Sequence, residues 1–342
     1  MSGRKLNRRQ AWRVEKIQEE RLARAQRKTE RLASSDETRQ LGKEQIGLIV
    51  ANFGALLHVE GRDGTIHPCK QRQNIEPVVV GDEVVWQSDP HGGGVVTAPL
   101  PRRSLLARPD PSGELHPIAA NVDQILVVTA PAPIYSSALI DQYLIAAEAT
   151  GITPILLFNK IDLLSGETHD AQQAQFDLYR QLGYQVIFAS TKSMHGLDEL
   201  RETLRGKNSV FIGQSGVGKS SLVQALLPDE TIAVGELSEQ SGLGQHTTTT
   251  ARLYHLPEGG NLIDSPGVRG FRIWPMETYS IARGFREFLP YLGRCKFRNC
   301  SHRHEPGCAL IEAVELNEIS AERLTSFHRI VDEQANYKPR YE

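Results

Sequence analysis

The sequence predicts a multidomain α/β protein, and three observations support that fold class. Short β-type segments fill residues 44–100, buried strands alternate with helices from residue 122 onward, and an irregular segment bearing Cys and His begins near Glu277. Strands that alternate with helices are typical of a parallel sheet covered by helices on both faces. A chain of 342 residues has room for two or three domains. We expect a basic extension, a β-barrel, an α/β domain and a C-terminal helical domain over residues 1–43, 44–106, 107–275 and 276–342.

The N-terminal extension is more basic than the rest of the chain. Its first 40 residues hold twelve Lys and Arg against six acids, whereas the whole chain has a net charge of −2. This asymmetry favours a nucleic-acid partner. The alternative is a solvated helix, because residues 12–32 are rich in Ala, Arg, Glu and Gln. No apolar run reaches the ~18 residues of a membrane span, and the basic N-terminus does not resemble a signal peptide. We therefore expect a cytoplasmic protein without a membrane partner. The sequence does not indicate an oligomeric state, and a monomer is the default expectation.

Residues 44–100 predict a small barrel. Turn sequences separate five short β-type segments, at 46–50, 55–59, 65–68, 83–87 and 94–97. Five strands in fewer than 60 residues suit the oligonucleotide-binding (OB) fold, although an SH3-like barrel has the same signature. Such barrels often bind nucleic acid, and some only brace other domains.

The rest of the chain predicts a linker, a sheet and a closing helix. Residues 102–117 are rich in Pro and Arg and indicate a linker. Strands are expected at 122–129, 153–158, 185–189, 209–212 and 262–263. Helices are expected at 137–149, 171–182, 197–204, from Lys219, and at 320–335 with Ser320 as N-cap. In such sheets, ligands bind at the carboxyl ends of the strands.

A phosphate-binding loop follows the strand at 209–212. Residues 213–220 match G-x-x-x-x-G-K-[ST] between a strand and a helix, the context that this motif requires. Backbone N–H groups would cradle the β-phosphate, Lys219 would reach the β/γ oxygens, and the Ser220 hydroxyl would bind Mg²⁺. The predicted nucleotide contacts here are Gly213, Gln214, Ser215, Gly216, Val217, Gly218, Lys219, Ser220 and Ser221.

Two further segments predict selection of guanine. The N-K-x-D sequence Asn159, Lys160, Ile161, Asp162 follows the strand at 153–158, and its carboxylate can accept from the N1–H and N2 amine of guanine. Adenine has no such donor pair, so ATP would lose a charged hydrogen bond of ~1.5–3 kcal/mol. Ser190, Thr191 and Lys192 follow the next strand and supply backbone N–H groups for the guanine O6.

The switch elements come last in the chain. Asp264 and Gly267 form D-x-x-G after the strand at 262–263, where Asp264 would hold Mg²⁺ through water and the Gly267 N–H would meet the γ-phosphate. A Thr of the loop at 244–250 would complete the Mg²⁺ shell; we favour Thr249, and its neighbours stay open. The motifs thus run base, base, phosphate, switch one, switch two. This is the usual GTPase order cut and rejoined, which leaves the sheet intact in space.

This motif order resembles the circularly permuted small ribosomal subunit biogenesis GTPases of the RsgA (YjeQ) family. The resemblance covers residues 44–335 and rests on NKID, GQSGVGKSS, GQHTTT, DSPGVR and the C-terminal Cys/His set. It implies an OB-fold domain, a circularly permuted P-loop GTPase domain and a zinc-binding C-terminal domain. It also implies GTP hydrolysis stimulated by the small ribosomal subunit during its late maturation, contacts to 16S rRNA, and other assembly factors as partners.

Hydrolysis is expected to be slow without a partner. Ras-like enzymes carry a water-orienting Gln after D-x-x-G, and Val268 holds that place here. His246 is the best candidate for positioning water, and the alternative is a surface-loop histidine. Arg269 could act similarly or contact phosphate or rRNA. We therefore name His246, Lys219 and Thr249 as the candidate catalytic residues.

The clustered cysteines predict one structural zinc ion. Cys295, Cys300, His302 and Cys308 supply four ligands of the right types, and His304 is a spare candidate. A catalytic zinc and a metal-free cluster are the alternatives. Cys69 is expected to be an ordinary barrel cysteine.

Three other functions would explain parts of the sequence. A nucleotide-gated RNA-binding scaffold would use GTP binding without needing turnover. An ATPase or kinase would share the phosphate loop but conflicts with the carboxylate of Asp162. A zinc-dependent transcription regulator would account for the basic ends but not for five ordered GTPase elements.

Overall fold

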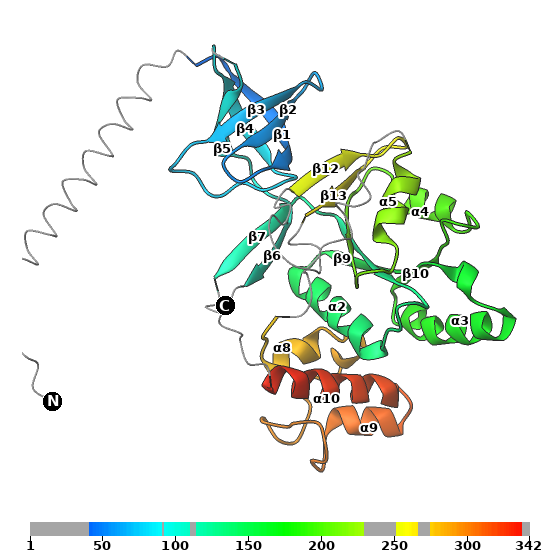
Figure 1. Ribbon diagram of the computed structural model, residues 1–342. Coiled ribbons are helices and arrows are strands. Elements are labelled where there is room, and N and C mark those ends of the chain that lie inside the picture. Colours follow the sequence, from blue (N-terminus) through cyan, green and yellow to red (C-terminus); the bar gives the residue numbers. More distant parts are fainter. Residues whose placement is uncertain (1–40, 91, 110–113, 229–250, 266–273, 337–342) are drawn as a thin grey trace, which may run out of the picture.

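The computed structural model describes residues 41–90, 92–109, 114–228, 251–265 and 274–336. Figure 1 shows a barrel at one end, an α/β unit in the middle and a helical C-terminal unit at the other end. This order along the molecule follows the order along the chain. No helix in the described ranges is long and apolar enough to cross a bilayer.

The predicted five-stranded barrel is confirmed. Its strands are β1 (Glu44–Asn52), β2 (Leu57–Gly61), β3 (Ile66–Gln71), β4 (Glu83–Ser88) and β5 (Gly94–Pro99). They pair in the order β1-β2-β3-β5-β4, with β3 parallel to β5, and the β1–β4 pairing closes the barrel. A register shift between Ile49 and Ala51 interrupts the pairing of β1 with β2, and the long β1 also pairs with β4. Trp86 and Val59 fill the core of this OB-like barrel.

The expected linker at 102–117 is wrong, because much of it forms a hairpin. Strands β6 (Leu105–Pro109) and β7 (Leu115–Ala120) pair antiparallel. Leu106 and Ala119 are fully buried and supply an apolar face that the prolines had obscured in the sequence. The hairpin leads back to the barrel, where the Ala120 N–H donates to the Val80 carbonyl (2.9 Å). A short apolar run can pair even between prolines when they lie at strand ends or bulges.

The central sheet confirms the predicted parallel α/β architecture. Five parallel strands lie in the order β10-β9-β8-β11-β13. Their bounds are β8 (Gln124–Thr129), β9 (Thr153–Phe158), β10 (Gln185–Phe188), β11 (Asn208–Ile212) and β13 (Asn261–Asp264). An antiparallel strand, β12 (Ala251–His255), was not predicted from the sequence; it pairs with β13 and also with β1 of the barrel. The barrel and the central sheet are therefore hydrogen-bonded into one continuous sheet.

Helices cover both faces of this sheet, as expected. Along β8, Ile125 and Val127 face one apolar core while Leu126 and Val128 face the other. Helices α2 (Ser137–Thr150) and α3 (Gly166–Gln181) pack on the first core, and α4 (Leu197–Leu204) and α5 (Lys219–Leu226) on the second. Helix α3 starts five residues earlier than predicted because Ser165 and Thr168 form a capping box at its polar first turn. A short 3₁₀ helix, η1 (Ile161–Leu163), follows β9.

The C-terminal unit is helical and packs against α2. It contains α8 (Thr278–Arg283), η2 (Arg286–Phe288), α9 (Ala309–Glu315) and α10 (Ala321–Ala335). Stacked and edge-on rings of Phe285, Phe288 and Phe327 form its core, which also includes Ile145 of α2. The Ser320 hydroxyl caps α10 by accepting from the Glu322 N–H (3.2 Å), as predicted. In Figure 1, α10 lies directly beside α2.

Candidate nucleotide and metal sites

The N-K-x-D segment lies against the phosphate loop. Asn159, the first residue after β9, is buried and its Nδ2 donates to the Val217 carbonyl (2.9 Å). Lys160 has a left-handed backbone (φ 61°), and its Nζ donates to the carbonyls of Gly216 (2.5 Å) and Ala132 (3.1 Å). Because parallel strands end at the same sheet edge, two segments almost sixty residues apart form one surface.

Asp162 is held as an ionised acceptor. Its Oδ1 accepts from the Ser190 hydroxyl (2.6 Å), and its Oδ2 lies 3.7 Å from the Lys192 ammonium. The Ser190 hydrogen bond, with the Lys192 charge as a smaller contribution, lowers the pKa of Asp162. Ser190 Oγ in turn accepts from the Lys192 N–H (3.1 Å) and the Ser193 N–H (3.2 Å), which fixes the loop. The carboxylate is therefore oriented to accept from a pair of N–H donors.

The phosphate loop requires glycine at two close approaches. Gly213 has φ 142°, and a Cβ there would lie 2.2 Å from the Val128 carbonyl oxygen. Gly218 has φ 94°, and its Cβ would lie 2.4 Å from Asn159 Nδ2. Lys219 opens α5 and its Nζ donates to the carbonyls of Gly213 (2.7 Å) and Gln214 (2.6 Å). The ammonium thus lies across the loop, at the N-terminus of a helix, where anions bind.

Two of the residues predicted to bind Mg²⁺ are described, and both have suitable ligand atoms. Ser220 is the second residue of α5, and Asp264 ends β13, which is the direct neighbour of β11. A hydroxyl and a carboxylate are the hard oxygen ligands that Mg²⁺ prefers, so these residues fit the ion. His246, Thr249, Gly267, Val268 and Arg269 lie outside the described residues.

The four predicted metal ligands form one cluster. Their ligand atoms, from Cys295, Cys300, His302 and Cys308, all lie within 4.8 Å of one another. The Sγ atoms of Cys295 and Cys308 are 4.0 Å apart, and His302 Nδ1 lies 3.5 and 3.3 Å from them. A tetrahedral zinc site has edges of roughly 3.8 Å between sulfurs and 3.6 Å from sulfur to nitrogen, so the cluster fits zinc. His304 is not part of this group.

The surroundings of the cluster orient its histidine. Burial lowers the pKa of His302, which keeps its imidazole in the neutral form that binds metals. The His302 carbonyl accepts from His328 Nε2 (2.8 Å), which ties the cluster to α10. Glu305 accepts from the Ser301 hydroxyl (2.6 Å) and N–H (2.7 Å) and orders the turn that carries the ligands. Cys69 is buried alone in the barrel, as expected.

The sequence did not single out one segment that contacts the candidate nucleotide site. Residues 130–136, between β8 and α2, lie beside it, because the Ala132 carbonyl accepts from Lys160 and the Pro133 ring lies 3.6 Å from the place of a Cβ at Gly216. The available signal was two prolines directly after a buried strand end, at Pro131 and Pro133. A loop that follows a parallel strand at the ligand-binding edge belongs to the site even without a motif.

Known proteins resemble this chain along most of its length. The family model described as RsgA GTPase matches residues 99–274. A protein named small ribosomal subunit biogenesis GTPase RsgA from Hahella chejuensis is 51% identical over 334 residues, covering 96% of each chain. The protein of the same name from Chromohalobacter salexigens is 53% identical over 336 residues, covering 97% of this chain and 98% of that one.

Two solved structures share the fold. The crystal structure of YjeQ from Thermotoga maritima has a TM-score of 0.70 and 32% sequence identity, covering 86% of this chain and 100% of that one. YloQ, described as a circularly permuted GTPase, has a TM-score of 0.67 and 29% identity, covering 87% and 98%. Because the matches cover 86% and 87% of this chain, the likeness is not confined to the central sheet.

Proposed function

The chain belongs to the RsgA GTPase family, and we propose that it hydrolyses GTP during small ribosomal subunit biogenesis, with the subunit itself accelerating the reaction. The observation that carries this proposal is the set of contacts between two halves of one site, the base-reading segment at 159–162 and the phosphate loop at 213–221. Asp162, locked by Ser190, reads the guanine, and Lys219 lies across the phosphate loop, while Lys160 and Asn159 hold the halves together.

Each part of the nucleotide then has a named contact. The carboxylate of Asp162 accepts from guanine, and the Thr191 N–H meets its O6. The other two N–H groups predicted for the O6 already have acceptors: Ser190 donates to the His195 carbonyl (3.0 Å), and Lys192 donates to the Ser190 hydroxyl (3.1 Å). The phosphates lie in the loop from Gly213 to Ser221, with Lys219 between the β- and γ-phosphates. Bound Mg²⁺ supplies charge neutralisation at the phosphates, and Ser220, Asp264 and Thr249 are the residues that would hold it.

The rate of hydrolysis depends on a group that positions the attacking water. Val268 offers no hydrogen bond to water at the position where Ras-like enzymes have glutamine. We assign water positioning to His246 and expect small subunits to complete the site in trans. The GTPase rate should rise at least about tenfold with purified small subunits, a threshold well below the ~10³–10⁵-fold that a residue supplied in trans can contribute.

The test compares wild type and His246→Ala, each with and without small subunits. The proposal requires stimulation of the wild type and its loss in His246→Ala. A wild-type rate that is unchanged by subunits refutes the regulatory part. Stimulation that survives in His246→Ala refutes only the assignment of the histidine.

The Cys and His cluster is proposed to hold one structural zinc ion. Three thiolates and an imidazole leave no open coordination position, which is typical of structural sites. Its turn carries Arg294, Lys296, Arg298 and Arg303, whose positive charge suits contacts to rRNA phosphates. The barrel is the second proposed rRNA-binding surface, as OB folds often are. In this account the central unit is the nucleotide switch, and 16S rRNA is bound on either side of it.

A further inference from the structure

The loop at 130–136 connects the nucleotide site directly to α2. It touches both halves of the site, through Lys160 at Ala132 and through Pro133 beside Gly216. It ends at Ser136, the N-cap of α2, whose hydroxyl accepts from the Leu139 N–H (3.3 Å). Any displacement of the first turn of α2 therefore moves the loop that supports the nucleotide site.

The first turns of α2 are fixed by buried polar contacts with the C-terminal unit. Asp141 is fully buried and accepts from Tyr179 (2.9 Å) and, through very short contacts, from Arg323 and Ser326 of α10. Arg323 also donates to both carboxylate oxygens of Glu287 (2.6 and 3.3 Å). A charge buried in this way is held in one geometry, because loss of a partner leaves the other unpaired.

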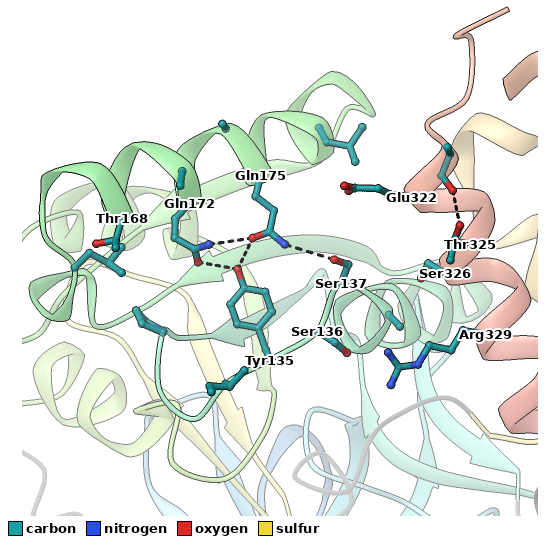
Figure 2. A pocket seen from close by; sticks show the side chains of 18 residues that line it. Tyr135, Ser136, Ser137, Thr168, Gln172, Gln175, Glu322, Thr325, Ser326 and Arg329 are labelled. Atoms are coloured by element: carbon teal, nitrogen blue, oxygen red, sulfur yellow. Dashed lines mark hydrogen bonds between the residues drawn. The ribbon is translucent and has the colours of Figure 1, made fainter. Parts of the chain in front are cut away.

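Apolar and polar contacts both hold this end of α2. The Tyr135 ring packs against Phe158 (5.9 Å between centroids) and Phe176 (6.2 Å). A cavity of about 1130 Å³ opens between α3 and α10, and the loop and the first turn of α2 form part of its wall (Figure 2). On that side, Tyr135 is hydrogen-bonded to Gln172 (2.8 Å) and Gln175 (3.1 Å) of α3, and Gln175 donates to Ser137 (3.4 Å). Polar contacts from α3 and α10, together with the packing of the Tyr135 ring, therefore set where the loop lies.

We propose that Arg323 is a positioning residue for the nucleotide site. Through Asp141 and α2 it sets the position of the 130–136 loop. Docking of the zinc-bearing unit on α2 is thereby coupled to guanine-nucleotide affinity. The inference rests on the proposed guanine-nucleotide function. A movement of the C-terminal unit would then affect the nucleotide site through α2, without involving the switch segments. A partner that shifts α10 would change nucleotide affinity, and by linkage the nucleotide would change the stability of the α10 contact.

The decisive variants weaken the network without removing its charge. Arg323→Lys keeps the cation but loses the bidentate contact to Glu287, and Ser326→Ala removes one hydrogen bond to Asp141. The matched control is Arg286→Lys, which weakens the ion pair with Glu148 (2.6 Å) near the other end of α2. Asp141 and Glu148 are separated by about 10 Å along the helix.

Three readouts separate positioning from stability: GDP affinity by calorimetry, hydrogen exchange of residues 130–136, and thermal stability of the full chain. Both network variants should bind GDP about five- to tenfold more weakly, the lower end of typical coupling between linked sites, with faster exchange in the loop. The control should keep GDP affinity within about twofold. In the wild type, GDP should also slow exchange in α10.

The inference is overturned if folded Ser326→Ala and Arg323→Lys bind GDP as the wild type does, or if all three variants lose affinity in proportion to their loss of stability. Should Arg323→Lys not fold, Ser326→Ala decides alone. A wild type that does not bind GDP is a different result, since it would refute the proposed function itself.

Discussion

Replacing Asp162 by asparagine should reverse the base preference of the nucleotide site. The side chain keeps its shape, and the Ser190 hydroxyl can still donate to its remaining oxygen, as it does to Oδ1 at 2.6 Å. The second oxygen, 3.7 Å from the Lys192 ammonium, becomes an NH₂ group that meets the guanine donors with another donor. GDP loses at least one charged hydrogen bond, ~1.5–3 kcal/mol, which weakens binding about tenfold to somewhat over a hundredfold.

Calorimetry with three nucleotides tests this reasoning. Xanthosine diphosphate, which carries a carbonyl in place of the N2 amine, should bind Asp162→Asn better than GDP does, and ADP should bind weakly throughout. The matched control is Asp198→Asn, which removes the same charge from a fully exposed side chain on α4. Unchanged GDP affinity in Asp162→Asn would show that this carboxylate does not read the base.

The same site makes a prediction about pH. The Ser190 hydrogen bond and the Lys192 charge lower the pKa of Asp162, so the carboxylate stays ionised well below neutrality. A depressed carboxyl pKa gives stabilisation that is present above the unfolded value of about 3.9 and is lost as the pH falls through the folded value. The terminal phosphate of a nucleoside diphosphate itself titrates at about pH 6, and this effect is common to GDP and ADP. The ratio of GDP affinity to ADP affinity should therefore be nearly the same at pH 7.5 and pH 5.5. A loss of that preference by tenfold or more over the interval would contradict the assignment.

Three further predictions concern the phosphates, the metal and the barrel. Lys219→Ala should lower kcat/KM for GTP at least about hundredfold, because one positioned charge at the phosphates is removed; a near-normal rate would exclude its role. Cys308→Ser should lose the single zinc ion measured by elemental analysis, while Cys69→Ser, buried but remote, should keep it. Arg102→Met should destabilise folding by about 3–5 kcal/mol in urea unfolding, because it leaves the buried Asp82 carboxylate without its bidentate partner.

Motifs were predictable because their chemistry restricts residue type and spacing together. The close backbone approaches of Gly213 and Gly218 could be predicted from the sequence, since they tolerate few other residues. The motif also predicted Lys219 in the same loop, where its ammonium donates to the Gly213 carbonyl. The cluster of Cys295, Cys300, His302 and Cys308 was predictable for the same reason. The two faces of the sheet also follow from local sequence, because its strands are buried on both sides and read as continuous apolar runs.

Other elements depend on contacts that no local pattern carries. Strand β12 is only five residues long and mixes Arg252 and His255 with the buried Leu253, which is too weak a pattern to predict a strand. It forms because it pairs with the edges of β13 and of the barrel strand β1. The β6–β7 hairpin has prolines that favour a linker, and its burial against the barrel outweighs that preference. The buried Arg323 and Asp141 lie 182 residues apart, so each resembles an ordinary surface charge in the sequence.

The proposed function requires one guanine nucleotide to be held by Asp162 at the base and by Lys219 at the phosphates. Titration of the intact chain with GDP and with ADP, under identical conditions in a calorimeter, tests this most directly. We expect one GDP to bind per chain and ADP to bind at least about tenfold more weakly, the lower limit for one lost charged hydrogen bond. Equal affinity for the two nucleotides, or no heat with either, would contradict the central claim.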